Sequence, residues 1–407
     1  MERIVFAIDV GTTKICTLVG EAREQGPLRI IGVGTSPSRG IEKGTVISVD
    51  EATQAIRASV AEAEQMSGSD VTHAVVGISG VHIAGVNSRG SADVARPTRG
   101  VSEEDIAHAL EQAQTIAIPY SHEILQAIPR GYILDGQDSI RDPIGMYGRK
   151  LEVEAHLVTG ASAPVNTLVK CVREAGVEVE TLVLQSLASG QVVLTEEERE
   201  SGVVLVDIGG GTTDVAIFIE GSVWHSAVIG RGGNLITRDL VMILQMPFRT
   251  AEELKIRCGH AESSEISDGE NVEVGGFGDQ PRRMIPRLLL AQIIEARVEQ
   301  ILGQVAEEIK RSGYSGLLPA GLVLCGGTAQ LSGIRAVARR VLGLPVRIGA
   351  PQGVHGVVDM VSNPAYACGV GLLQWNATFG REHRESKPAP AGWSERLRDL
   401  LGRVLPG

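Results

Sequence analysis

Two segments of this chain place an aspartate, glycines and threonines between two apolar runs. The first reads VFAIDVGTTKICTLV over residues 5–19, and the second reads VLVDIGGGTTDVAIF over residues 204–218. Each pattern predicts a strand, a tight turn and a second strand. Glycines let backbone N–H groups approach phosphate oxygens, threonine hydroxyls add donors, and a carboxylate can hold a hydrated Mg²⁺. A single turn of this kind is an ordinary hairpin, but two of them favour duplicated halves that clamp one nucleotide.

The residues expected to contact the polyphosphate lie in these two turns. Asp9 and Asp207 end the first strand of each pair, and we expect both near Mg²⁺. Lys14 either adds positive charge to the first turn or is a surface lysine. The other expected phosphate contacts are Gly11, Thr12, Thr13, Gly209, Gly210, Gly211, Thr212 and Thr213. A third glycine turn is a candidate floor for adenine and ribose, and it contains Gly326, Gly327 and Thr328.

Three other polar residues have both a structural and a functional interpretation. Glu252 and Lys255 lie one turn apart in an expected helix, and by themselves they are typical of a surface ion pair worth less than ~1 kcal/mol. Gln185, at the end of an expected strand, either caps the next helix or orients a water towards a γ-phosphate. An amide is a poor proton acceptor, so the second interpretation predicts slow hydrolysis.

The C-terminal segment combines a polar linker with an amphipathic pattern. Residues 380–392 contain two prolines and no large apolar side chain, which predicts a disordered linker. In residues 393–407, a helical period gathers one apolar arc with arginines beside it. A helix packed on its own core has the same stripe, but the linker and the arginines favour reversible binding in an anionic membrane interface. The expected membrane contacts are Trp393, Arg396, Leu397, Leu400, Leu401 and Val404.

Composition limits the classes of protein. The 407 residues carry a formal net charge of −11, which argues against nucleic acid as a partner because a phosphate backbone requires a basic surface. The five cysteines have no C-x-x-C spacing and the nine histidines form no i,i+3 or i,i+4 pair, so a zinc site is not expected. Aromatic residues make up only 3% of the chain, so the core must rest on Val, Ile, Leu and Ala. No run of eighteen apolar residues is present that could span a membrane.

Hydrophobic periodicity predicts the order of the elements. Strands are expected at 4–8, 15–20, 29–35, 74–78, 178–185 and 322–324, and helices at 164–175, 187–195, from 251, 287–312 and 333–342. Asp50 is expected to cap the first helix, and a helix from Ser102 to about 116 lies in the turn-rich insert. Residues 196–200 are expected to be a solvated loop and 262–280 a polar, mobile loop.

This order indicates a chain of two halves with an insert and a detached tail. The expected division is a first core subdomain at 1–82 and 164–200, an insert at 83–163, a second core subdomain at 201–230 and 318–379, an outer subdomain at 231–317, the linker at 380–392 and the amphipathic helix at 393–407.

The glycine turns, together with PAYACGVGLL at 364–373, resemble the superfamily of actin, heat-shock chaperones and sugar kinases. Within it, the chain resembles the FtsA family of bacterial cell-division proteins over nearly its whole length. The specific motifs are HAVVGISGVHIAG at 73–85, EILQAIPRGYILDGQ at 123–137, DPIGMYGRKLEVEAH at 142–156 and LVLCGGTAQLSGI at 322–334. The resemblance implies an α/β fold of duplicated, ribonuclease-H-like actin domains around a nucleotide cleft, with a small α+β insert.

The resemblance also implies a function. Such a protein binds ATP or ADP with Mg²⁺, forms filaments of itself, and tethers the C-terminal peptide of the tubulin-like FtsZ to the cytoplasmic face of the cell membrane at the division septum. Its insert recruits later division proteins. Glu252 and Lys255 would contact the ribose and the adenine edge, and Arg297, in the FtsZ-docking region 251–313, would meet acidic residues of the FtsZ tail. The bacterial actin MreB has a glutamate near the position of Gln185, so at most slow ATPase activity is expected.

Two alternatives share the superfamily. A sugar or acetate kinase would also bind ATP, but it has no use for the linker and the basic amphipathic tail, and no catalytic base for a second substrate can be placed. A pilus-assembly relative would have a similar insert and typically lacks such a tail.

Overall fold

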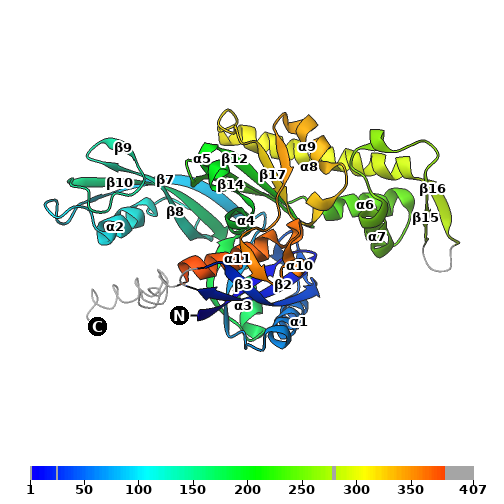
Figure 1. The fold of residues 1–407 in the computed structure, drawn as a ribbon, viewed down its shortest axis with the longest axis horizontal. Helices are drawn as coiled ribbons and strands as arrows, with labels where there is room; N and C mark the ends of the chain where they lie inside the picture. Colours follow the sequence, from blue (N-terminus) through cyan, green and yellow to red (C-terminus); the bar gives the residue numbers. More distant parts are fainter. Residues whose placement is uncertain (1, 24–25, 277–280, 381–407) are drawn as a thin grey trace.

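The computed structural model describes residues 2–23, 26–276 and 281–380, which form two lobes and a projecting insert (Figure 1). Two large sheets organise these residues, one of six strands and one of nine. The expected linker beyond Gly380 and the amphipathic segment 393–407 lie outside the described residues. No helix in the described part of the chain has both the length and the apolar character needed to cross a membrane.

The six-stranded sheet of the first lobe begins with an antiparallel meander, β1-β2-β3, to which β6 and β11 add in parallel beside β1. Its order is β11-β6-β1-β2-β3-β19. The strands are β1 (Glu2–Val10), β2 (Lys14–Arg23), β3 (Leu28–Pro37), β6 (His73–Ile78), β11 (Glu178–Leu184) and β19 (Val354–Gly356). A small hairpin of β4 (Ile41–Glu42) and β5 (Thr45–Val46) follows β3.

The nine-stranded sheet repeats this plan and then continues into the insert. Its first part is the antiparallel meander β12-β13-β14, with β17 parallel to β12. The full order is β18-β17-β12-β13-β14-β7-β10-β8-β9. The strands are β12 (Val203–Ile208), β13 (Thr213–Ile219), β14 (Ser222–Ile229), β17 (Leu322–Cys325), β18 (Val346–Ile348), β7 (Ile83–Asp93), β8 (His122–Leu134), β9 (Gln137–Ile140) and β10 (Lys150–Ala161).

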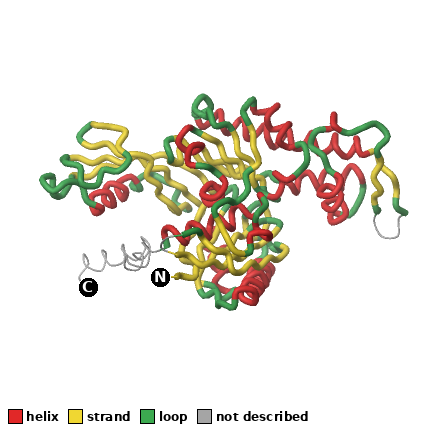
Figure 2. The backbone as a smooth tube through the Cα atoms, in the orientation of Figure 1, coloured by secondary structure: helices red, strands yellow, loops and turns green. Residues whose placement is uncertain are grey.

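The insert is therefore an extension of the second lobe's sheet, although in sequence it lies within the first lobe, between β6 and α3. The junction is the pairing of β14 with β7, at Ala227 and Ala84. Helix α2 (Glu103–Ala113) covers β7 and β10, and Figure 2 shows the insert as strands with this one helix. Ser102 caps α2 as expected, in a capping box with Asp105.

Helices cover both faces of the first lobe's sheet. On one face lie α1 (Val49–Ser67) and α3 (Ser162–Glu174), and on the other lie α4 (Gln185–Val193) and α11 (Ala367–Phe379). Helices α4 and α11 pack on each other between the two sheets (Figure 1). A helix buried between two layers needs apolar residues all around it, and most side chains of α4 and α11 are buried.

The outer part of the second lobe is mainly helical (Figure 2). It contains α6 (Gly233–Leu244), α7 (Phe248–Cys258), α8 (Arg287–Ser312) and a hairpin of β15 (Asn271–Val274) and β16 (Arg283–Pro286). The shorter elements of the chain are α5 (Glu196–Ser201), α9 (Ile334–Leu342), α10 (Val358–Val361), η1 (Ser263–Glu265), η2 (Gly327–Gln330) and η3 (Pro364–Tyr366).

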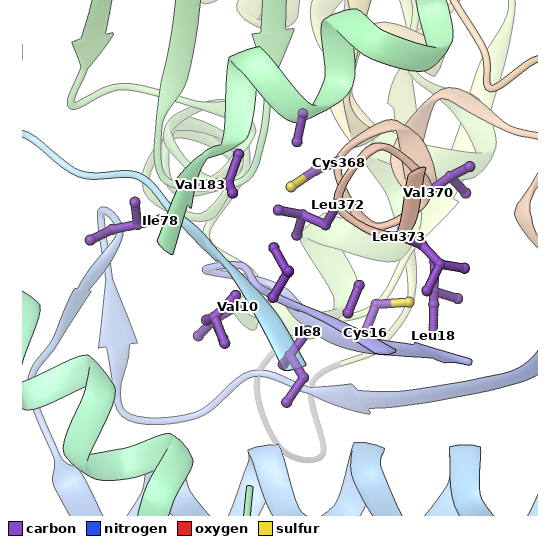
Figure 3. Packing of buried hydrophobic residues seen from close by; sticks show 14 of the residues in the cluster. Ile8, Val10, Cys16, Leu18, Ile78, Val183, Cys368, Val370, Leu372 and Leu373 are labelled. Carbon is purple, nitrogen blue, oxygen red and sulfur yellow. The ribbon is translucent and has the colours of Figure 1, made fainter. Parts of the chain in front are cut away.

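The cores consist mainly of aliphatic side chains, as the low aromatic content predicts. The largest fully buried side chains in the described residues are all Ile or Leu. Figure 3 shows α11 packed over β1 and β2, with Leu373 beside Leu18. Burial of aliphatic surface supplies most of the free energy that holds the helix there.

Several sequence predictions differ from the structure in detail. Residues 196–200 form a helix, α5, because the Thr195 side chain accepts from the Glu198 N–H while the Glu198 carboxylate accepts from the Thr195 N–H. The first helix begins after Ser48, so Asp50 lies in its first turn. The polar segment 262–280, expected to be a loop, contains η1 and β15.

The expected division between lobes is wrong for residues 354–379. These residues were expected in the second core subdomain, but β19 pairs with β3 and α11 packs on β1, β2 and β6. The chain therefore returns to the first lobe after β18 and closes its sheet. Neither contact follows from local periodicity, because each joins segments roughly three hundred residues or more apart in sequence.

Candidate nucleotide-binding site

The two glycine hairpins have the same backbone register. In the first, Val10 pairs with Ile15 and the Gly11 N–H donates to the Lys14 carbonyl over 3.1 Å. In the second, Ile208 pairs with Thr213 and the Gly209 N–H donates to the Thr212 carbonyl over 3.0 Å. Lys14 is thus the structural equivalent of Thr212.

When the two hairpins are aligned by this register, their Gly-Thr-Thr sequences are offset by two residues, so the threonines of the two turns are not equivalent. Thr12 and Thr13 lie at the tip of the first hairpin, where the second hairpin has Gly210 and Gly211. Thr213 is already in β13, and its hydroxyl donates to the Arg231 carbonyl over 2.8 Å. Of the residues predicted in the two turns, Thr213 is therefore the one whose side chain supports the backbone and does not line the cavity.

The hairpin tips approach each other so closely that a side chain on the second is excluded. A Cβ atom on Gly210 would lie 1.9 Å from the Thr13 hydroxyl oxygen, and one on Gly211 would lie 2.5 Å from that of Thr12. Such separations are far inside van der Waals contact. Glycine at these two positions allows the backbone of the second hairpin to pack against the threonine side chains of the first.

A cavity of about 470 Å³ opens beside this contact. Its volume lies in the range of pockets that hold small molecules. Apart from Thr213, every residue predicted for nucleotide contact lines it, from all three glycine turns and from α4 and α7. The additional lining residues are Gly233, Asn234, Ile256, Gln330, Leu331, Asn363, Ala365, Tyr366 and Cys368.

Two carboxylates at the ends of β1 and β12 face the cavity. Asp9 accepts a hydrogen bond from the Gln185 amide nitrogen at 2.9 Å, and Asp207 accepts one from the Ser189 hydroxyl at 2.8 Å. Burial raises the pKa of Asp9 to about 6 and also raises the pKa of Asp207. Desolvated carboxylates of this kind favour a nearby cation.

Asp214 is a third buried carboxylate, directly behind the second hairpin. It accepts a hydrogen bond from the Ser79 hydroxyl at 2.6 Å, and burial raises its pKa to about 7. The negative charges of Asp207 and Asp9 add to this effect. Within the described ranges, no group of three or more His, Cys, Asp and Glu side chains is arranged to hold a metal ion by itself. Mg²⁺ is usually bound by one or two carboxylates together with water and phosphate oxygens, so Asp9 and Asp207 fit that mode.

Gln185 is the first residue of α4, not the last of a strand. Its side chain reaches into the cavity, where Asp9 holds the amide group. Gln185 does not cap α4, because the N-cap residue is Leu184 and no side chain makes a capping hydrogen bond there.

Glu252 and Lys255 do not form a surface ion pair. Lys255 is only 8% exposed, and its ammonium lies 2.7 Å from the Glu252 carboxylate. The same ammonium donates to the Thr237 hydroxyl at 2.9 Å, and burial lowers the Lys255 pKa. Both side chains line the cavity, which places them where an ion pair can contact a ligand.

The third glycine turn is joined to the second hairpin. The Thr328 hydroxyl donates to the Gly209 carbonyl at 3.1 Å. Gly326 has a φ of 86°, and a Cβ atom there would lie 2.4 Å from an oxygen of Asp207. The turn therefore forms one wall of the cavity and holds the second hairpin in position.

Sequence reasoning missed the start of α6. The N–H groups of Gly233 and Asn234 donate to the carbonyls of Gly209 and Gly210 over 2.9 and 2.8 Å. A fourth glycine turn, Arg231-Gly-Gly-Asn234, precedes this amphipathic helix in the sequence and was the available signal.

Comparison with known proteins separates the insert from the second half of the chain, as the structure does. The family model described as "Cell division protein FtsA" matches residues 204–371, and the "SHS2 domain inserted in FTSA" matches residues 80–159. A cell division protein FtsA of Pseudomonas aeruginosa is 43% identical, over 92% of this chain and 89% of the relative. The chain belongs to the FtsA family. FtsA of Escherichia coli is 36% identical over 92% of this chain and 90% of its own, and FtsA of Bacillus subtilis is 38% identical over 91% and 83%.

Solved structures with little sequence similarity share the fold. The PilM-PilN type IV pilus biogenesis complex gives a TM-score of 0.63 at 14% identity, covering 92% of this chain and 98% of the other. MreB 5 of Spiroplasma citri bound to AMPPNP gives 0.57 at 15% identity, covering 95% and 99%. The expected actin-like α/β fold with an inserted domain is confirmed for this FtsA-family chain.

Arg297, the predicted contact for an acidic peptide, lies away from the cavity on α8. Its guanidinium binds both carboxylate oxygens of Asp239 on α6, at 2.5 and 2.8 Å. This hydrogen bonding raises the pKa of Arg297. An acidic peptide that used Arg297 would have to compete with Asp239.

We predict that Asp214→Asn stabilises the ligand-free protein at about pH 8 by roughly 1–4 kcal/mol and has little effect near pH 4. The folded-state pKa of about 7 exceeds the ordinary aspartate value of 3.8, so the folded state binds more protons than the unfolded state between these values. Stability from this group is therefore lost as pH rises through that window. Thermal unfolding at both pH values measures the effect, with the exposed Asp268→Asn as control. Equal stabilisation at both pH values would contradict the assignment.

Proposed function

We propose that the cavity binds ATP or ADP with Mg²⁺ and that nucleotide binding governs a filament-forming scaffold of cell division. The observation that carries the proposal is the contact of the two glycine hairpins beside the cavity, with a buried carboxylate at the end of each first strand. Phosphates need convergent N–H donors, and Mg²⁺ needs oxygen ligands with room for water. Membership of the FtsA family supports the same function.

Each part of the cavity has a role in this proposal. The hairpin residues Gly11 to Lys14 and Gly209 to Thr212 would contact the phosphates, while Asp9 and Asp207 would hold hydrated Mg²⁺. The ion pair of the half-buried Glu252 and the buried Lys255 would contact the ribose and the adenine edge. The turn at Gly326, Gly327 and Thr328 would form the floor beneath the nucleoside.

Hydrolysis by this site is proposed to be slow at most. Gln185 lines the cavity, but its amide nitrogen is used by Asp9 and its side chain cannot accept a proton as a glutamate would. Gln185 would therefore orient a water without activating it. A long-lived ATP state suits a scaffold whose assembly depends on bound nucleotide.

We predict that Asp207→Ala weakens Mg²⁺-ATP binding by roughly 10–100-fold, because an oxygen that holds the hydrated cation is lost. Calorimetric titration measures the affinity with and without Mg²⁺. Asp138→Ala, at an exposed position of the insert, is the matched control and should bind as the parent does. The same affinity in the Asp207 variant and the parent would refute the cation role.

Membrane attachment is proposed for the segment 393–407 from its sequence. In a helix, the spacing of Trp393, Leu397, Leu400, Leu401 and Val404 would place them on one face beside Arg396. Burial of these side chains supplies several kcal/mol at most before the cost of ordering, so one copy would bind reversibly. A filament presents many copies, and avidity would then hold it at the cytoplasmic face of the cell membrane at the septum.

We predict that Trp393→Glu reduces binding to anionic vesicles by more than about tenfold, because a charge replaces the largest apolar group of the face. ATP affinity should remain that of the parent. Vesicle flotation measures binding, with Trp393→Phe as the conservative control and deletion of 393–407 as the limiting case. Flotation of the deletion variant equal to that of the full chain would remove the tail from the proposal.

The partners proposed for the body of the protein are FtsZ, later division proteins and further copies of this chain. The FtsZ C-terminal peptide would dock on the region 251–313, and the insert would recruit the later proteins. The Arg297–Asp239 pair supplies a specific point of competition, because an acidic peptide and Asp239 would use the same guanidinium.

We predict that Asp239→Asn strengthens binding of the FtsZ C-terminal peptide and that Arg297→Gln weakens it, each by a few-fold. The first change releases the guanidinium and the second removes it. Fluorescence anisotropy with a labelled peptide measures both, and Arg249→Gln serves as a control for loss of one exposed arginine from the same subdomain. Weaker binding by the Asp239 variant would show that Arg297 is not the contact.

A further inference from the structure

Lys14 lies in the cavity with an unusual set of partners. Its ammonium is 3.3 Å from the centroid of the Tyr366 ring and donates to the Ala365 carbonyl at 3.1 Å. No ion pair joins Lys14 to a carboxylate within the part of the chain that the structure describes. Its charge nevertheless acts on the site, because it lowers the pKa of Asp9 against the larger effect of burial.

The partners of Lys14 hold its position without cancelling its charge. An aromatic face attracts an ammonium through its quadrupole, and a carbonyl accepts one of its three N–H donors. A carboxylate partner would instead neutralise the positive charge. Burial raises the pKa of Tyr366, so this ring stays uncharged at neutral pH.

Tyr366 is itself held by the wall of the cavity. It ends η3, whose Pro364 carbonyl accepts from the Gly326 N–H at 3.0 Å and whose Asn363 side chain accepts from the Ala365 N–H at 2.9 Å. Helix α11 begins at the next residue and packs on the first lobe's sheet. Segment 364–366 therefore connects the first hairpin, through the Tyr366 ring, to the third glycine turn, through the Pro364 carbonyl.

We propose that Tyr366 is a positioning residue that presents the Lys14 ammonium to the polyphosphate of the nucleotide. This inference rests on the proposed function of the cavity. It adds a residue that the glycine motifs do not contain, and it assigns the aromatic ring a role through Lys14.

The first test is a comparison of Tyr366→Leu with Tyr366→Phe in the full chain. Leucine removes the aromatic face and should weaken Mg²⁺-ATP binding by roughly threefold to tenfold, whereas phenylalanine keeps the face and should bind as the parent does. Tyr147→Leu, at an exposed tyrosine of the insert, controls for the substitution itself. In a Lys14→Met background, Tyr366→Leu should have little further effect, because the ring acts through the ammonium.

A second measurement separates the cation–π contact from packing. Incorporation of phenylalanines with one to three ring fluorines at 366 changes the quadrupole with little change in shape, and ATP affinity should fall with each fluorine. This series still tests the inference if the Tyr366→Leu variant does not fold. Equal affinity across the series, or an undiminished effect of Tyr366→Leu without Lys14, would overturn the inference alone. A parent chain that does not bind ATP would overturn the proposed function and the inference together.

Discussion

The contact between two hairpin tips is the constraint on which the rest of the structure depends. Gly210 and Gly211 meet Thr12 and Thr13 at distances that leave no room for a Cβ atom. The turns of both lobes are thereby brought to one place, where they line a common cavity. Everything around this contact holds it: α6 donates to the second hairpin, Thr328 bonds to Gly209, and α4 and α11 pack between the two sheets.

The second constraint is an imbalance of charge. Three carboxylates, Asp9, Asp207 and Asp214, are buried around the hairpins, where desolvation disfavours their ionised forms. Lys14 contacts a ring and a carbonyl, and Lys255 is paired with Glu252. The site thus holds more acid than base. Such an arrangement costs stability in the absence of a cation and favours cation binding, so folding and ligand affinity are opposed at the same residues.

The insert and the returning chain determine how the lobes are joined. The insert continues the second lobe's sheet through β14 and β7, although in sequence it lies between β6 and α3 of the first lobe. Residues 354–379 make the opposite exchange. They follow strands of the second lobe in sequence but complete the first lobe's sheet with β19 and cover it with α11. Each lobe is therefore built partly from a segment that is adjacent in sequence to the other lobe. Tyr366 and Cys368, at the start of α11, line the cavity. A change in the cavity therefore directly affects the segment that returns to the first lobe.

The sequence by itself determined the features that are local. The strand–turn–strand hairpins, the capping of α2 and the bounds of α8 follow from turn chemistry and periodicity within short windows, and the capping box of Thr195 and Glu198 is an equally local signal for α5. Tertiary structure alone decided the rest. The hydrogen bond from Thr213 to Arg231, the burial of Lys255 and the placement of 354–379 on the first lobe each depend on contacts between segments that are not adjacent in sequence. Strand pairing and side-chain burial are properties of the assembled layers, which no local pattern of residues specifies.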